Sequence, residues 1–504
     1  MSGSRTKEMG MRLGRSLAIG VALGLGWMGP AAAEIYRFQI LQLNDVYEIT
    51  PVQGGRSGGL ARVATLLKQL KAENPQTWSM LAGDYLSPSA LGTAKVNGDR
   101  LAGQQMVAVL NAMGLDLATF GNHEFDISEA QLRQRLQEQK FALVTGNVLD
   151  AQGRLFPNTQ TDYQFQVQAT DCQKPVCPPL KVSVLGVTID SNQAPYVRYG
   201  DPLKTLQQQI QQRQSNTDLF IGLTHLNLSQ DQRLARSLPA LDLILGGHEH
   251  ENIQQWVGDD FTPIFKADAN ARTVYVHRLT YDSDRRDLQI SSQLVPITPV
   301  IPEDPTTAAV VQTWLEKGFT GFRAQGFDPS AIVGRTTEPL DGLESSVRNE
   351  STALTRLIAK SYLRAVPTAE LAIYNSGAIR IDDVLPSGPI SQYDVIRMLP
   401  FGGAIASVEM RGELLQRVLE QGLKNRGSGG FLQTDGVQRS DRGWQIQGQP
   451  LRPDRWYRVA IADYLLTGQE KGLGFLTEQN PGLRSLQRGQ DVRFAVIAQL
   501  QAQR

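Results

Sequence analysis

Short apolar segments, each followed at once by a polar cluster, recur through the first half of this 504-residue chain. The segments and the polar residues after them are 38–43 with Asp45, 78–81 with Asp84, 117–120 with Asn122 and His123, 219–224 with His225, and 243–245 with His248 and His250. Apolar residues at helical spacing between them predict helices over 59–70 and 104–113. Strands that alternate with helices predict an α/β fold, in which polar residues at strand ends are where active sites form.

Prolines at 299, 302 and 305 interrupt this pattern, and residues 306–322 then predict one exposed helix. A second α/β region begins near Ile332. We therefore expect a first domain over 34–300, a helical linker over 301–330 and a second domain over 331–504.

The N-terminus has the features of a targeting signal. Basic residues up to Arg15 precede an apolar run over 17–28, and three alanines end at Ala33. This order predicts a secretory signal peptide over 1–33 and an exported protein, periplasmic or extracellular. The alternative is a retained membrane anchor, although the run is short for a span. No other segment is apolar enough to span a membrane.

Cysteine usage and charge limit the classes of protein further. Cys172 and Cys177 are the only cysteines, and in an oxidising compartment they form either one small disulfide or two free thiols. Basic and acidic residues number 50 each, which argues against binding a nucleic-acid polymer through bulk positive charge. The 41% of hydrophobic residues suffices for a folded core.

Histidine placement is the strongest chemical signal, because four of the five histidines follow predicted strands. The fifth, His277, lies inside a strand-like run and is read as structural. Three imidazoles, two carboxylates and one carboxamide form a mixed nitrogen and oxygen donor set that suits two divalent ions of Zn, Mn, Co or Fe. Two such ions activate water and clamp a phosphoryl group together. Singly, each side chain is more often a cap or a satisfied polar group.

The motifs LNDVY, AGDYLS, GNHEFD, LTHLNLS and GGHEH resemble those of the calcineurin-like metallophosphoesterases, and more closely those of the secreted 5′-nucleotidase family. The resemblance implies a four-layer α/β fold, a β-sandwich flanked by helices, followed by a second α/β domain that binds substrate. It also assigns roles by position: Asp45 and His250 to the first metal, Asp84 to both metals, Asn122, His225 and His248 to the second metal, His123 as general acid or transition-state stabiliser, and Asp126 as the residue that orients His123.

One position departs from the family pattern, which has Asp-x-His where this chain has Asp45-Val46-Tyr47. Tyr47 either binds metal as a phenolate, hydrogen-bonds a metal water, leaves the site one ligand short, or merely packs. A phenolate favours a harder ion such as Fe(III) over Zn²⁺. We therefore expect a first metal site that is weaker than usual or differently selective.

The second half contains the expected substrate-binding residues. NSGAIR resembles the family motif Asn-x-Gly-x-Ile-Arg and provides Asn375, Gly377 and Arg380. A further arginine, Arg348, opens a helix-like segment. Arginine forks suit phosphate, although surface ion pairs are the alternative. In the family, a phenylalanine in each of two glycine-rich loops stacks on the base, here Phe431 and Phe475. Alternatively, both rings are loop anchors. LPFGG at 399–403 resembles another family landmark.

These features predict an exported enzyme that uses two metal ions to remove the 5′-phosphate of nucleotides, as a monomer or homodimer. A broader phosphoesterase acting on 2′,3′-cyclic nucleotides or nucleotide sugars is the enzymatic alternative. A non-catalytic nucleotide-binding protein is the alternative from another class. Metals on one domain and a substrate clamp on the other imply that the domains close for catalysis.

Overall fold

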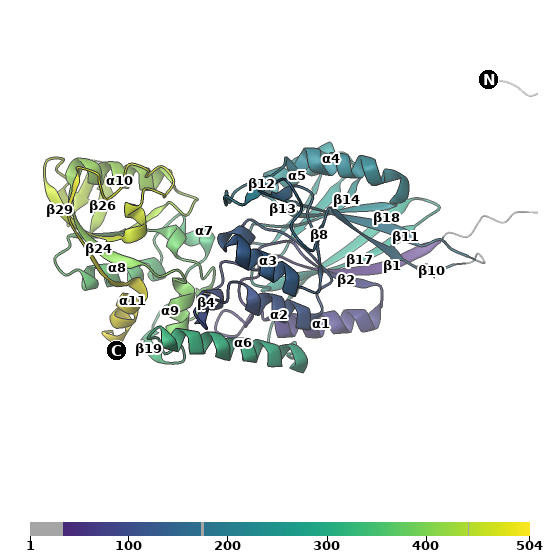
Figure 1. The fold of residues 1–504 in the computed structure, drawn as a ribbon, viewed down its shortest axis with the longest axis horizontal. Coiled ribbons are helices and arrows are strands. Elements are labelled where there is room, and N and C mark those ends of the chain that lie inside the picture. Colours follow the sequence, from purple (N-terminus) through teal and green to yellow (C-terminus); the bar gives the residue numbers. More distant parts are fainter. Residues whose placement is uncertain (1–33, 173–175, 442, 504) are drawn as a thin grey trace, which may run out of the picture.

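The computed structural model describes residues 34–172, 176–441 and 443–503. The two expected α/β regions form two domains that lie end to end (Figure 1). A disulfide joins Cys172 and Cys177, whereas the predicted signal peptide lies outside the described residues. Within the described ranges, no helix combines the length and apolar character needed to cross a membrane.

The first domain is built on a sandwich of β-sheets. One sheet has the order β18-β17-β1-β2-β5-β6-β8, and β10 also pairs with β1. Its strands are β1 (Ile35–Leu43), β2 (Thr77–Leu81), β5 (Leu117–Thr119), β6 (Ala142–Val144), β8 (Thr159–Gln160), β10 (Ala169–Asp171), β17 (Thr273–Asp282) and β18 (Asp287–Pro296). The other sheet has the order β15-β16-β14-β13-β11-β9. Its strands are β9 (Asp162–Val167), β11 (Leu180–Thr188), β13 (Leu219–His225), β14 (Leu241–Gly247), β15 (Ile253–Val257) and β16 (Thr262–Lys266).

Helices cover the outer faces of both sheets. Those on the β1 side are α1 (Leu60–Glu73), α2 (Gln104–Met113) and α3 (Glu129–Glu138), and those on the β13 side are α4 (Pro202–Arg213) and α5 (Leu228–Ser237). The apolar core between the sheets includes Phe38, Met80 and Leu223. A separate core, which includes Leu206 and Leu234, joins α4 and α5 to their sheet. The four-layer α/β fold is thus confirmed.

Burial explains why the helices form where the spacing predicted them. In α1, Leu60, Val63, Leu67 and Leu70 are buried on one face, as a 3.6-residue period requires. The bounds of α2 agree with the predicted range of 104–113. His277, for which the sequence predicts a structural role, is buried within β17.

Strand direction places the polar clusters at one end of the sandwich. In one sheet β1, β2 and β5 are parallel neighbours, and in the other β11, β13 and β14 are parallel. The carboxyl ends of parallel strands lie at the same edge, so the residues that follow them converge. This end of the sandwich faces the second domain (Figure 1).

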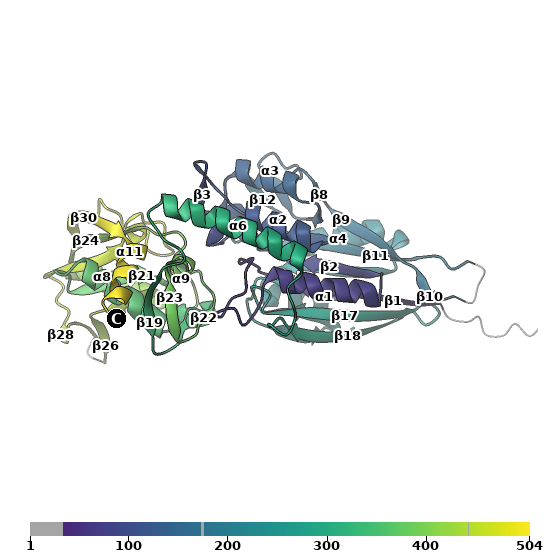
Figure 2. The same ribbon diagram turned by 90° about the horizontal axis from the view of Figure 1, so that it is seen from below.

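The connecting helix α6 (Pro305–Ala324) packs along the first domain beside α1 and α2 and runs toward the second domain (Figure 2). The sequence predicted an exposed helix, but one face is buried. A Cβ on Gly321 would lie 2.5 Å from the Lys95 carbonyl oxygen, so only glycine allows this close approach. At the same end of α6, Phe319 and Phe322 contact Tyr393 of the second domain.

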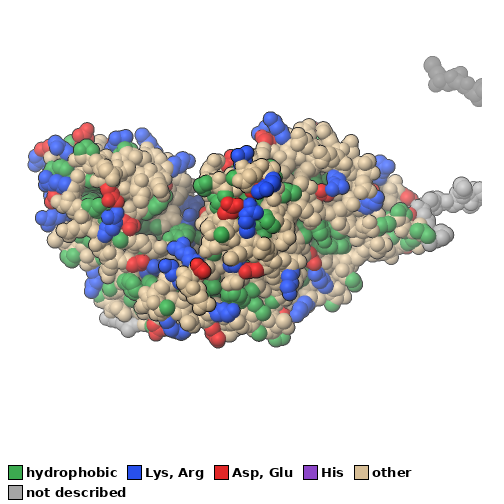
Figure 3. All heavy atoms as spheres, in the orientation of Figure 1, with side chains coloured by type: hydrophobic (Ala, Val, Ile, Leu, Met, Phe, Trp, Pro, Cys, Tyr) green, Lys and Arg blue, Asp and Glu red, His purple; other side chains and the backbone are tan. Residues whose placement is uncertain are grey.

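The second domain contains a mixed sheet with the order β25-β21-β29-β24-β30. Its strands are β21 (Leu371–Asn375), β24 (Ala404–Arg411), β25 (Leu432–Asp435), β29 (Trp456–Ala462) and β30 (Leu483–Asp491). The helices around it are α7 (Glu344–Val347), α8 (Ala353–Ala365), α9 (Gln392–Met398), α10 (Gly412–Lys424) and α11 (Val492–Gln501). Figure 3 shows charges of both signs mixed over one face of the molecule, which is hollowed between the two domains.

Candidate metal centre and adjoining substrate cavity

The residues that follow the parallel strands meet in one buried cluster. Asp45, Asp84 and His225 each offer a ligand atom, and these atoms lie within 4.8 Å of one another. All three side chains are at most 1% exposed. Buried carboxylates without a compensating positive charge are costly, so this arrangement favours a cation.

Backbone strain accompanies this cluster. Asp45, Asp84 and His248 have φ values of 52°, 57° and 84°, in the left-handed region that non-glycine residues rarely adopt. Hydrogen bonds hold them there, including one from the His248 amide to Asp45 Oδ2 at 2.9 Å. Glu124, which the sequence analysis missed although it lies in GNHEFD, accepts the amides of Asp84 at 3.0 Å and Tyr85 at 2.7 Å.

One half of the cluster surrounds the Tyr47 hydroxyl. Tyr47 Oη lies 3.1 Å from Asp84 Oδ2, 3.0 Å from His250 Nε2 and 3.4 Å from Asp45 Oδ1. His250 Nε2 is itself 3.6 Å from Asp45 Oδ1. Tyr47 therefore lies among the residues expected to hold the first metal, and it is more than a packing residue.

The other half joins His225, Asn122 and His248. His225 Nε2 is 3.3 Å from Asp84 Oδ2 and 3.2 Å from Asn122 Oδ1, and His248 Nδ1 is 3.1 Å from the same Asn122 oxygen. His225 Nδ1 lies 2.8 Å from the Ala82 carbonyl oxygen, to which only an N–H can donate. In that tautomer the Nε2 lone pair of His225 points at two oxygen acceptors. Lone pairs that face one another repel, and a cation between these atoms would make the arrangement favourable.

The electrostatics of the imidazoles agree with a cation site. Burial opposes a charge on His225, but Asp84 and Asp45 outweigh it and raise the pKa of His225 to about 9. Burial also opposes a charge on His250, but nearby carboxylates, of which Asp382 has the largest effect, outweigh it and raise the pKa of His250 to about 10. Burial and His225 lower the pKa of His248 to about 2. The carboxylates thus attract positive charge strongly, and their donor chemistry fits divalent ions.

His123 and Asp126 form a pair beside this cluster. His123 Nδ1 lies 2.7 Å from Asp126 Oδ2, and the His123 amide donates to Asp84 Oδ1 at 2.8 Å. Burial opposes protonation of His123, but Asp84 and Asp126 raise its pKa above the ordinary value. Asn192, from a loop that the sequence analysis did not single out, donates to Asp126 Oδ1 at 2.7 Å and fixes that carboxylate.

The second domain closes over the cluster with charged side chains. Both Arg348 and Arg380 pair with Glu344, the latter at 3.6 Å between Nη1 and Oε1. Asp382 Oδ2 reaches across the domain boundary to His250 Nδ1 at 2.9 Å. These residues, apart from Arg380, line a cavity of about 330 Å³ between the domains. The sequence did not predict Glu344 and Asp382, because they reach the site only through the packing of the two domains, which no local sequence pattern reveals.

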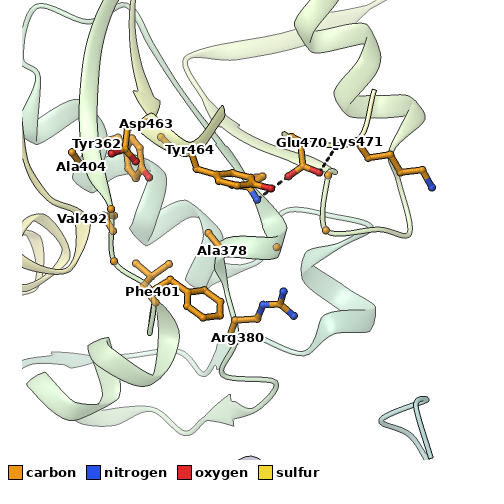
Figure 4. Close-up of a pocket in the computed structure, with 18 of the residues that line it drawn as sticks. Tyr362, Ala378, Arg380, Phe401, Ala404, Asp463, Tyr464, Glu470, Lys471 and Val492 are labelled. Carbon is orange, nitrogen blue, oxygen red and sulfur yellow. Dashed lines mark hydrogen bonds between the residues drawn. The ribbon is translucent and has the colours of Figure 1, made fainter. Parts of the chain in front are cut away.

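A larger cavity, of about 490 Å³, lies in the second domain and is lined by Asn375, Gly377 and Arg380 of the NSGAIR motif (Figure 4). The Gly377 amide donates to the Gly429 carbonyl at 2.7 Å, a close backbone approach that a side chain would obstruct. Phe401 and Tyr464 also line this cavity, with 46% and 42% of their surface exposed.

The aromatic residues of this cavity differ from those expected. Phe431 is only 7% exposed, and Phe475 is half-buried beneath Arg417, whose guanidinium carbon lies 3.6 Å from the ring centre. Neither lines the cavity. Glycine-rich surroundings therefore did not imply exposure here: the Phe431 amide donates to the Ser428 carbonyl at 3.0 Å, and the Arg426 guanidinium carbon lies 5.6 Å from the centre of the Phe431 ring. The sequence motif that does contain an aromatic residue of this cavity is LPFGG, which includes Phe401.

Comparisons with known proteins agree with this architecture. Residues 38–252 match the model for calcineurin-like phosphoesterases, and residues 332–477 match the model for the 5′-nucleotidase C-terminal domain. The chain is 27% identical to protein UshA of Yersinia enterocolitica, over 90% of each chain. It is 26% identical to a 5′-nucleotidase of Vibrio cholerae, over 87% of this chain and 86% of that one.

A solved structure shares the fold across both domains. The 5′-nucleotidase precursor from Thermus thermophilus superposes with a TM-score of 0.73 at 20% identity, over 93% of this chain and 97% of that chain. Both domain models match in the order in which the two domains occur here. The chain belongs to the 5′-nucleotidase family, with a calcineurin-like phosphoesterase domain followed by a 5′-nucleotidase C-terminal domain.

Proposed function

We propose that this protein is a metal-dependent phosphomonoesterase that hydrolyses the 5′-phosphate of nucleotides to nucleoside and phosphate. The observation that carries the proposal is the position of Arg380. Arg380 lines the aromatic cavity, pairs with Glu344 near His250, and lies near enough to His123 that its charge offsets part of the rise that Asp84 and Asp126 cause in the pKa of His123. A ligand with a base in the cavity therefore extends its phosphate toward His123 and the carboxylates.

The metal-binding residues would be those of the buried cluster: Asp45, Tyr47, Asp84 and His250 at one position, and Asp84, Asn122, His225 and His248 at the other. When bound, divalent ions supply positive charge to the phosphate and activate the attacking water. The ligand types admit Zn, Mn, Co or Fe, and a phenol oxygen from Tyr47 shifts the preference toward harder ions.

The chain's own residues perform the proton transfer and the binding of phosphate. Asp126 holds His123 Nδ1, so the opposite nitrogen is free to give a proton to the leaving 5′-oxygen as its bond to phosphorus breaks. Arg348 and Arg380 exchange Glu344 for the phosphate oxygens, because a guanidinium fork binds either anion.

The nucleoside would lie in the 490 Å³ cavity, against Phe401 and Tyr464. Stacking on an aromatic ring contributes about 1–3 kcal/mol per base. We predict that Phe401→Ala raises KM for a nucleoside 5′-monophosphate roughly 5- to 150-fold, the kinetic equivalent of that energy. KM for p-nitrophenyl phosphate, which has no base, should change little. Equal effects on both substrates would contradict base binding at Phe401.

The same assay separates the remaining candidates. Steady-state phosphate release from nucleoside 5′-monophosphates, 2′,3′-cyclic nucleotides and nucleotide sugars should favour the monophosphates. Higher kcat/KM for another class would support the broader phosphoesterase. Nucleotide binding without any phosphate release would support the non-catalytic protein.

The domain boundaries and the location of the protein extend the proposal. We assign catalysis to residues 34–300, the connecting helix to 301–330 and substrate binding to 331–504. Export is supported by the Cys172–Cys177 disulfide, which persists in oxidising compartments. N-terminal sequencing of the exported protein should begin at Glu34.

A further inference from the structure

A carboxylate of the second domain contacts a histidine of the metal cluster in the first. Asp382 Oδ2 lies 2.9 Å from His250 Nδ1, and the Asp382 side chain is 5% exposed. On the far side of the same ring, His250 Nε2 faces Asp45 and Tyr47. One imidazole therefore links the second domain to the first metal position.

Asp382 is held rigidly in this contact. Its φ is 38°, in the left-handed region, and its other carboxylate oxygen accepts the Glu344 amide at 2.9 Å. Arg272 donates to the His250 carbonyl oxygen at 2.9 Å and fixes the backbone on the first-domain side. Both ends of the contact are thus anchored within their own domains.

This geometry determines which nitrogen of His250 can bind a cation. A carboxylate 2.9 Å from Nδ1 accepts the Nδ1 proton, which leaves the Nε2 lone pair directed at the cluster. A carboxylate behind a metal-binding histidine fixes its tautomer and orientation, and removal of such a partner typically weakens metal binding about 10- to 100-fold.

We propose that Asp382 is a positioning residue that completes the first metal site across the domain boundary. Metal binding and docking of the second domain are then coupled. By linkage, an ion at the first site stabilises the docked arrangement to the same extent that docking strengthens its binding. The inference rests on the proposed metal-dependent function, which it deepens by adding a dependence on the second domain.

The test uses Asp382→Asn, which keeps the shape of the side chain and suits a left-handed backbone. Binding of Mn²⁺ alone to the metal-free purified protein is measured by calorimetry and by metal analysis. We expect two bound ions in the unaltered protein, and in the variant one of them bound about 10- to 100-fold more weakly. Asp382→Glu should recover part of the loss.

Asp383→Asn is the matched control. Asp383 is adjacent and lies in the same interface, where it accepts the Gln53 amide at 3.0 Å and Arg397 Nη2 at 3.1 Å, but it contacts no residue of the metal cluster. In a His250→Ala background, Asp382→Asn should cause no further loss of Mn²⁺, because its effect acts through that ring. Asp383→Asn, which weakens docking but leaves the contact between Asp382 and His250, should reduce Mn²⁺ binding less than Asp382→Asn does. An undiminished loss from Asp382→Asn in the His250→Ala background would overturn the proposal.

Hydrogen exchange supplies a readout of docking that is independent of turnover. Mn²⁺ should slow amide exchange around residues 344–350 and 380–385 in the unaltered protein, and Asp382→Asn should abolish this protection. Mn²⁺ binding by Asp382→Asn equal to that of the unaltered protein would overturn this inference alone. Absence of Mn²⁺ binding in the unaltered protein would overturn the proposed function with it.

Discussion

Tyr47 shows how one side chain can alter a metal site. Its hydroxyl lies 3.0–3.4 Å from three candidate ligand atoms. Ligands about 2.1 Å from one ion are about 3.0 Å apart at adjacent octahedral positions and about 3.4 Å apart in a tetrahedron. The spacing therefore supports the proposal that Tyr47 is a fourth ligand of the first metal, although the same distances suit hydrogen bonds from its hydroxyl.

The identity of residue 47 should therefore set the metal preference. We predict that Tyr47→His tightens Zn²⁺ binding at one of the two sites, because imidazole suits Zn²⁺ better than a phenol does. Tyr47→Phe, which removes only the hydroxyl, should weaken it. Zinc titration of the three proteins measures both effects. Two equivalent, tight zinc ions in the unaltered protein would refute a weaker or differently selective first site.

The pair of His123 and Asp126 should determine the alkaline limb of the pH profile. In the proposed mechanism the active form of His123 is protonated, so we expect activity to be lost as pH rises through its raised pKa. Asp126→Asn removes a carboxylate that raises this pKa, and the limb in kcat should move to lower pH. Measured kcat between pH 5 and pH 10 checks the sign. A limb that stays in place would exclude His123 as the general acid.

At the scale of elements, a buried ion cluster supports the loop after β14. Lys266, which is fully buried at the end of β16, pairs with Asp231 of α5 at 2.8 Å and with Glu249. Its ammonium also donates to the Gly247 carbonyl at 2.8 Å, one residue before His248. The cluster thus ties a helix and a strand to the loop that presents His248 and His250.

Removal of the lysine should be costly. Lys266→Met leaves two carboxylates without their partner, and breaking a buried pair from one side typically costs about 3–5 kcal/mol. Urea unfolding of the variant measures this loss. The double variant Lys266→Met/Asp231→Leu should recover part of the stability, because it removes one of the stranded charges. A single variant as stable as the unaltered protein would contradict this role of the cluster.

These elements also show how far the sequence could predict the structure. The strands, α1, α2 and the residues after each strand were predictable, because burial and periodicity act locally. The position of Tyr47 among the cluster followed from its motif. The burial of Phe431, the exposure of Phe401 and the contact of Asp382 with His250 were not predictable, because each depends on how distant segments pack.

At the scale of the whole molecule, buried polar contacts lock the domains together. Arg397 of α9 pairs with Asp383 at 3.1 Å and crosses to Glu48 of the first domain at 3.5 Å. In this docked state Glu344 forms ion pairs with both Arg348 and Arg380, the two residues proposed to bind phosphate. Substrate must displace that carboxylate, which favours an opening motion of the domains before binding.

A crosslink across the boundary should therefore stop turnover. An added Cβ on Gly54 would lie 3.0 Å from Pro386 Cγ, so cysteines at these two positions would lie close together across the boundary, and we use this pair for the crosslink. We predict that oxidised Gly54→Cys/Pro386→Cys loses most phosphate release and regains it on reduction, whereas each single variant is unaffected by oxidant. Unchanged turnover in the crosslinked protein would argue against domain motion.

We propose that the buried cluster holds the divalent ions with which the protein hydrolyses nucleotide 5′-phosphates. The most direct measurement is phosphate release from a nucleoside 5′-monophosphate by chelator-treated protein, before and after addition of Mn²⁺, Zn²⁺ or Co²⁺. We predict no release after chelation and its recovery with at least one ion. Full release from the chelated protein, or no release with any of the three ions, would contradict the claim.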